Sequence, residues 1–467
     1  MPAAATSDNF TLNRRVVLLT VCLGAFMATL DTSIVNIALP QIAGDFHCSM
    51  VQISWVMLIY LLMNVALLLT SGRLGDLLAP GKLFLTGLVV FTGASALCGV
   101  SPSFFWMIAA RAFQGIGASL MLGVAPKIIA LLYAEGERGL ALGLFSTAFA
   151  AGISVGAPLG GVITTYLGWP FIFYINIPIC AVAFGVGRRV LAKLAAQRPW
   201  NWRAFDLSGA VVLAGTLGLF LLGLTWLRQS GAGAISLGAL GAAFLLALGL
   251  TFLERRQPEP LIHRELWRHW PFIIGSIAVV LTFAPVMGTF FLLPFFLEQI
   301  FHYTPDQAGF LLAALSVSNA VVAPFGGYLA DRLGNLLILR VGAGLILAGM
   351  ILLVFTGQDS ATLTLAARFV LVGLGFGLFQ APNLNEILLE INPGMIGLAA
   401  STNAVLKNLG SLFGITLMVM AFAWLNYGHG TLGAENTLGL GAFQKAFALA
   451  ALVAALNLGA NLLPRKS

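Results

Sequence analysis

Apolar runs of about 20 residues recur along the whole chain, and each is long enough to cross a hydrocarbon core of roughly 30 Å as an α-helix. Outer-membrane strands are a poor alternative, because they alternate polar and apolar residues in short segments and these runs do not alternate. Only 9% of the residues are charged, whereas an ordinary globular domain carries roughly 25%. The sequence therefore predicts an all-α integral membrane protein.

The apolar runs define fourteen expected spans. They lie near 15–38, 52–71, 82–100, 103–125, 138–163, 169–189, 207–228, 234–254, 271–298, 305–329, 336–357, 361–382, 395–424 and 441–463. With the N-terminus inside, the loops rich in Lys and Arg are all cytoplasmic, as the positive-inside rule requires. We therefore expect a multi-pass protein of the bacterial inner (plasma) membrane with both termini in the cytoplasm. The net charge of +7 then reflects topology rather than a nucleic-acid partner.

The chain also repeats itself at an offset of about 255 residues. The repeated landmarks are Gly72-Arg-Leu-Gly-Asp76 with Gly327-Tyr-Leu-Ala-Asp331, Arg111 with Arg368, and Pro126 with Pro382. This predicts two six-helix bundles, at 14–190 and 270–464, after a short cytoplasmic segment at 1–13. The residues 191–269 are then linkers and an inserted pair of transmembrane helices. Transporters built from parallel repeats bind substrate between the halves near the midplane.

Four further segments carry a family resemblance. Leu30–Pro40, Gly72–Lys82, Arg111–Gly117 and Gly152–Gly161 resemble signatures of the major facilitator superfamily, specifically its fourteen-helix drug:proton antiporter branch, and Phe205-Asp206 opens the inserted pair as in that branch. The resemblance covers essentially the whole chain. It implies a proton-coupled antiporter that exports small hydrophobic or cationic compounds, as in multidrug efflux, by alternating access.

Asp31 is the strongest candidate for a functional side chain. It lies sixteen residues beyond Arg15, or roughly 24 Å along its helix, inside the hydrocarbon region. An ionised carboxylate is costly there, and a carboxyl group that can lose its charge can carry a proton. Arg111 lies at a similar depth, so we expect the two residues to pair and to couple protons to transport. The alternatives are a carboxylate that braces its helix and an arginine that bonds backbone carbonyls.

A second group of residues, at the cytoplasmic helix ends, is typical of a gate. Gly72 permits close approach of helices, and Asp76 can meet an opposing helix N-terminus or a basic residue such as Arg138. Arg73 belongs to the same motif, and Asp331 is its counterpart in the second repeat. A loop with ordinary solvated charges is the alternative.

Small residues recur in the fifth expected span, which resembles the antiporter-motif helix: Gly152, Gly156, Gly160 and Gly161, with Pro158 among them. Small residues at this spacing let helices approach closely, and proline bends a helix. Simple helix packing explains the same pattern, so both interpretations stay open.

For substrate we expect a cavity lined by aromatic and amide side chains, although each of them also suits ordinary packing. The candidates are Phe26, Asn36, Trp55, Tyr60, Asn64, Gln114, Phe290, Phe291, Asn319, Phe379, Gln380, Asn383 and Asn403. The sequence offers no partner for Arg368 or Lys407, because the position that matches Asp31 in the second repeat is Val286.

The sequence argues against several other classes of protein. The four cysteines are far apart, and the chain has no metal-ligand cluster, Walker loop or nucleophile-base set, so we expect neither enzyme activity nor a cofactor. The expected partners are a lipophilic small molecule, protons and membrane lipids. We expect a monomer, with a periplasmic adaptor as an optional partner. A narrow-specificity transporter of a metabolite, siderophore or lipid is the main alternative.

Overall fold

The computed structural model describes residues 7–194, 207–230, 233–256, 265–389, 391–392, 395–426 and 439–463. These residues form fourteen helical segments long and apolar enough to cross a membrane, and no strand. This confirms the expected helical membrane fold. The helices are α1 (Ser7–Asp45), α2 (Met50–Leu77), α3 (Pro80–Gly99), α4 (Phe104–Leu132), α5 (Glu135–Tyr166), α6 (Phe171–Tyr174), α7 (Asn176–Leu191), α8 (Leu207–Ser230), α9 (Ala234–Arg256), α10 (Trp270–Ile300), α11 (Pro305–Leu333), α12 (Asn335–Val354), α13 (Thr362–Leu388), α14 (Ile396–Asn426) and α15 (Leu440–Leu462).

The helix ends extend beyond the apolar runs at several places. The helix α1 begins at Ser7, inside the expected N-terminal segment, and continues through Pro40 to Asp45. The helix α2 begins earlier than expected, because Ser49 and Gln52 form a capping box at its start. A short break separates α6 from α7, and together they form the sixth span. Phe205-Asp206 lies outside the described residues.

The same packing pattern occurs in both halves of the chain. In the first half, α1 packs on α5 and α7, and α4 packs on α2 and α3. In the second half, α10 packs on α14 and α15, and α13 packs on α11 and α12. Each of these helix pairs in one half has a counterpart in the other, so the helix packing follows the internal repeat of the sequence. The pair α8 and α9 packs against itself and lies against α2 and α14.

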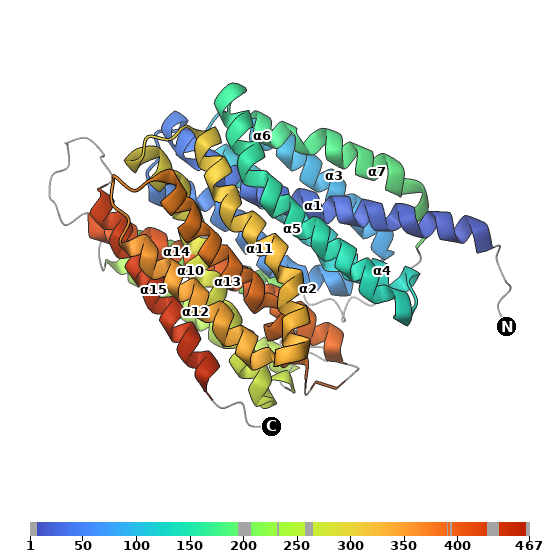
Figure 1. Cartoon of the computed structure of the whole chain (residues 1–467). Helices are drawn as coiled ribbons and strands as arrows, with labels where there is room; N and C mark the ends of the chain where they lie inside the picture. The colour runs from blue at the N-terminus through green and yellow to red at the C-terminus, as the bar shows by residue number, and fades with distance from the viewer. Residues whose placement is uncertain are drawn as a thin grey trace.

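The fourteen spans alternate in direction, so α1 begins and α15 ends at the same face of the molecule, here called the terminal face. The other face is called the opposite face. Figure 1 shows the two halves in contact toward the opposite face, near α6, where α5 and α11 run side by side. The start of α1 and the end of α15 lie apart, because the halves diverge toward the terminal face.

Candidate functional site

Asp31 lies in the interior of the first half and is completely buried. Its Oδ2 accepts a hydrogen bond from Arg111 Nη1 at 2.6 Å, which is also an ion pair, and neither side chain is exposed. Its Oδ1 accepts from Gln114 Nε2 at 2.7 Å and from Asn176 Nδ2 at 3.0 Å. Ser95 Oγ accepts from both amides, at 2.8 and 3.2 Å. One carboxylate is therefore held by donors from α4 and α7, with α3 behind them.

Arg111 is fixed from several other directions. Its Nη1 also donates to Gln114 Oε1 at 2.7 Å, and its Nε donates to the carbonyl of Val56 in α2 at 3.0 Å. The guanidinium lies 4.5 Å from the centre of the Tyr60 ring, whose hydroxyl donates to Ala28 O. Arg111 thus does what both interpretations of the sequence expected, since it pairs with Asp31 and bonds a backbone carbonyl. Its Nη2 has no hydrogen-bond partner among the described residues.

Ser95 and Asn176 were not predicted as site residues from the sequence, and Gln114 was predicted to line the substrate cavity. All three are completely buried beside Asp31. Their signal is weak, because a single serine or amide in an apolar span is common and only its rotation about the helix axis brings it to the carboxylate. Gln114 follows Arg111 by three residues, so it lies on the same face of α4, and this spacing is the one cue that the sequence offered.

The glycines of α5 serve two faces of that helix. One face lies against α1, where a Cβ built on Gly152, Gly156 or Gly160 would collide with that helix. The atoms in the way belong to Phe26 and Thr29 for Gly152, to Leu30 and Ser33 for Gly156, and to Ile34 and Ile37 for Gly160. Hydrogen bonds strengthen the same contact, since Thr29 Oγ1 and Ser33 Oγ donate to carbonyls of α5, each at 2.9 Å. The predicted small-residue helix is therefore clamped on α1 along its length.

The other face of α5 meets α11 across the two halves. A Cβ on Gly161 would collide with the carbonyl of Pro305, and a Cβ on Gly309 would collide with the carbonyl of Ala157. Gly309 also lies beside Pro158. Ser154 Oγ donates to Ser316 O at 3.1 Å, and Thr165 Oγ1 donates to Asp306 Oδ1 at 3.2 Å. These contacts close the halves together from the middle of α5 to its end at the opposite face.

Two further hydrogen bonds cross between the halves. Asn36 Nδ2 of α1 donates to the carbonyl of Phe290 in α10 at 2.8 Å, and Asn36 is completely buried. Asn408 Nδ2 of α14 donates to Asn64 Oδ1 of α2 at 3.2 Å. Three expected cavity residues, Asn36, Asn64 and Phe290, therefore lie where the two halves meet.

The remaining cavity candidates fall into three groups. Phe26 and Trp55 are half-buried in the first half, and the ring of Phe291 packs against that of Phe295 at a tilt of 35°. Asn319 and Gln380 bond each other in the second half at 3.3 Å. Phe379, Asn383 and Asn403 are buried in the second half, where Asn383 Nδ2 donates to Gly275 O at 3.2 Å. Whether these side chains contact a substrate stays a prediction.

The expected gate residues lie at the terminal face. Gly72 packs against the carbonyl of Gly123, so α2 approaches α4 closely. Arg138 Nε donates to Tyr133 O at 2.9 Å. Arg73, in the same turn of α2, is half-buried. The side chain of Asp76 is outside the described part of the structure, so its expected contact with Arg138 stays a prediction.

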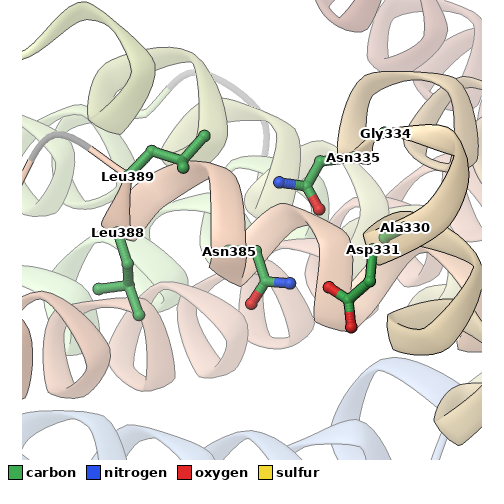
Figure 2. Close-up of a pocket in the computed structure, with 7 residues that line it drawn as sticks. All are labelled: Ala330, Asp331, Gly334, Asn335, Asn385, Leu388 and Leu389. Atoms are coloured by element: carbon green, nitrogen blue, oxygen red, sulfur yellow. The ribbon is translucent and has the colours of Figure 1, made fainter.

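Asp331, the second-repeat counterpart of Asp76, is exposed and borders a hollow at the terminal face. Figure 2 shows Asp331 and Asn335 on one side of this hollow, and Asn385, Leu388 and Leu389 on the other. Within the described residues, no group of three His, Cys, Asp or Glu side chains is placed to hold a metal ion.

Comparison with known proteins identifies the family. The family model described as "Major Facilitator Superfamily" matches residues 21–415. The chain belongs to the major facilitator superfamily. Among its relatives in this superfamily, the riboflavin transporter RibZ of Clostridioides difficile is 33% identical over 87% of this chain and 88% of its own length. The tetracenomycin C resistance and export protein of Streptomyces glaucescens is 30% identical over 87% of this chain and 75% of its own.

A third relative, the multidrug resistance protein Stp of Mycobacterium tuberculosis, is 27% identical over 86% of this chain and 75% of its own length. These relatives place the chain in the drug-transporter branch of the major facilitator superfamily. The chain is therefore a multi-pass membrane transporter.

Proposed function

We propose that this transporter exports small hydrophobic compounds in exchange for protons, with Asp31 as the proton carrier. The observation that carries the proposal is the Asp31–Arg111 pair, which is completely buried at 2.6 Å inside a membrane span. Ionisable side chains at this depth are expensive and mark proton relays or ligand pathways. A carboxylate that binds and releases a proton changes the charge of its surroundings without any cofactor.

Protonation of Asp31 acts inside the first half, and α1 carries its effect to the contacts that join the halves. It removes the negative charge that holds Arg111 and leaves the guanidinium with a neutral partner, so α1 is held less firmly to α4. The helix α1 also carries Asn36, which bonds α10, and it clamps α5, which meets α11. Loss of the charge therefore favours movement of the α1–α5 unit against the second half. The expected halves at 14–190 and 270–464 are the units that rock.

The terminal face is proposed to be cytoplasmic. The basic residues at this end of the described helices include Arg188, Arg189, Lys193, Arg268, Arg332 and Arg340. Lys and Arg residues near helix ends accumulate on the cytoplasmic side of a membrane protein. In this orientation the structure is closed toward the outside. We propose a monomer in the bacterial inner membrane, as the sequence led us to expect.

The names of the relatives support export but also a narrower alternative. The tetracenomycin C resistance and export protein and Stp favour export of foreign or secondary compounds. The riboflavin transporter RibZ favours transport of one physiological solute. The second candidate function is therefore a transporter of a single metabolite, on the same Asp31 machinery.

Transport by the full-length protein in vesicles tests the proposal. An imposed pH gradient should drive uptake of a lipophilic dye, and adding the dye should release protons. Asp31→Asn should abolish both fluxes, because an amide cannot take up a proton at neutral pH. Asp359→Asn is the matched control, since Asp359 is exposed and should keep the wild-type rates.

The proposal is wrong if Asp31→Asn still concentrates the dye at the wild-type rate under a pH gradient. A panel of fluorescein, rhodamine 123 and riboflavin also separates the two candidate functions. Transport of several unrelated compounds supports broad export, whereas transport of riboflavin alone supports the narrow alternative.

A further inference from the structure

The second half contains a lysine at membrane depth without a carboxylate. Lys407 lies in α14, eleven residues into the helix from Ile396, and is half-buried. Its Nζ donates to Gln380 Oε1 of α13 at 3.5 Å, a long hydrogen bond. Among the described residues, no carboxylate forms an ion pair with it. An ammonium group in this setting has spare donors and no counter-charge.

Amide groups surround this lysine at two levels. Gln380 Nε2 donates to Asn319 Oδ1 of α11 at 3.3 Å, so three helices contribute to one polar chain. One turn closer to the terminal face, Asn403 of α14 and Asn383 of α13 are both buried, and each has an oxygen without a hydrogen-bond partner among the described residues. Unsatisfied buried acceptors are uncommon, and a bound molecule with donors satisfies them.

This polar chain lies next to the surface where the halves meet. Asn408, adjacent to Lys407, bonds Asn64 of the first half. Ser316, one turn before Asn319, accepts from Ser154 of the first half. The two ends of this polar chain are thus beside two of the contacts between halves, and substrate binds between halves in transporters of parallel repeats. Phe283 supplies an aromatic surface, since its ring centre is 5.6 Å from Lys407 Nζ, and Phe376 packs against it edge-on.

We propose that Lys407, Gln380, Asn319 and Asn403 form a substrate subsite, the lysine subsite, for a negatively charged or carbonyl oxygen on an aromatic compound. This inference rests on the proposed transport function and names its substrate class. An anionic oxygen supplies the counter-charge that Lys407 lacks among the described residues, and an N–H or O–H group of the same compound can donate to the free oxygen of Asn403. A lipophilic cation meets repulsion at the same place. The subsite therefore narrows the expected hydrophobic or cationic substrates to neutral and anionic ones.

Binding of two dyes to the purified full-length protein in detergent tests the lysine subsite. Fluorescein and rhodamine 123 share a xanthene ring system, but fluorescein is an anion at neutral pH and rhodamine 123 is a cation. Fluorescence polarisation should give a fluorescein dissociation constant about tenfold or more below that of rhodamine 123. Lys407→Gln should weaken fluorescein binding by about tenfold and leave rhodamine 123 unchanged or bound more tightly.

Two variants separate a ligand contact from a structural role. Lys407→Arg keeps the charge and should retain most of the preference for fluorescein, whereas Lys193→Gln removes an exposed positive charge and should change nothing. Asn403→Leu should weaken fluorescein binding while Lys407 remains. If Lys407→Gln does not fold, the comparison of the two dyes on the wild-type protein still tests the lysine subsite.

The inference is overturned if the wild-type protein binds rhodamine 123 as tightly as fluorescein, if it binds neither dye, or if Lys407→Gln binds fluorescein like the wild type. Its failure is distinguishable from failure of the proposed function, because binding in detergent needs no proton gradient. A protein that exchanges rhodamine 123 for protons and binds it as tightly as fluorescein keeps the proposed function and loses the lysine subsite. A protein that binds fluorescein through Lys407 without proton exchange keeps the lysine subsite and loses the proposed function.

Discussion

Asn36 of α1 supplies the hydrogen bond that Phe290 of α10 lacks within its own helix. In an α-helix the carbonyl of residue 290 accepts from the N–H of residue 294, but position 294 is proline and has no N–H. Asn36 Nδ2 donates to this carbonyl from the other half at 2.8 Å. The proline thus exposes a backbone acceptor in the membrane interior, and closure of the two halves satisfies it.

Asn36→Ala should therefore favour separation of the halves at the opposite face. The variant leaves the Phe290 carbonyl without a donor, which costs about 1 to 3 kcal/mol and changes the ratio of closed to open molecules by a factor of about 5 or more. Spin labels on cysteines placed at the exposed positions Gly44 and Gln299 report the distance between α1 and α10. A longer distance is expected in a background without the four native cysteines.

The double variant Asn36→Ala/Pro294→Ala separates stability from closure. Alanine at position 294 restores the helical N–H to the Phe290 carbonyl, so thermal stability should recover while the halves stay apart. If the double variant instead returns to the wild-type distance, the cross-bundle hydrogen bond does not contribute to closure.

Gly161→Ala should also favour separation of the halves at the opposite face, through a steric clash. The new Cβ collides with the Pro305 carbonyl, so α11 must move away from α5, at a cost of about 1 to 3 kcal/mol. The matched control is Gly143→Ala in the same helix, where a Cβ meets no atom within 4 Å. Thermal unfolding and the spin-label distance should change for Gly161→Ala alone. Equal melting temperatures and distances for the two variants would show that the α5–α11 contact accommodates the new Cβ without loss of stability.

Arg111→Met should strongly destabilise the protein, because it leaves the Asp31 carboxylate buried without its counter-charge. Removing one partner of a buried pair costs about 3 to 5 kcal/mol. Adding Asp31→Asn should recover much of this loss, since the double variant buries no charge. Thermal unfolding of the two single variants and the double variant in detergent measures the coupling. Additive losses in the double variant would contradict an energetic link between the two residues.

Glu137→Gln should have little effect on stability, although Glu137 also forms an ion pair. Arg14 Nη2 lies 2.6 Å from Glu137 Oε2, but the two side chains are 24% and 54% exposed. Exposed pairs of this kind are worth about 0.2 to 1 kcal/mol, because water screens the charges. The melting temperature should remain close to the wild-type value at low and high salt. A large drop at low salt would mean that this pair holds α1 to α5 at the terminal face.

Much of the fold could be predicted from the sequence because the membrane restricts the choices. Each apolar run must become a helix that satisfies its own backbone, so the fourteen spans followed from length and composition. Depth along a helix rises by a constant step per residue, and for that reason the pairing of Asp31 with Arg111 was expected before the structure showed it.

Tertiary structure alone decided how each helix is rotated and which neighbour each polar side chain meets. Between membrane helices no strong hydrophobic force selects one face, so close packing of small residues and polar contacts sets the rotation. This packing brought Ser95 and Asn176 to Asp31, gave the two faces of α5 different partners, and placed Gln380 beside Lys407. Sequence spacing determines how deep a residue lies, whereas contacts between segments far apart in the chain determine what it touches.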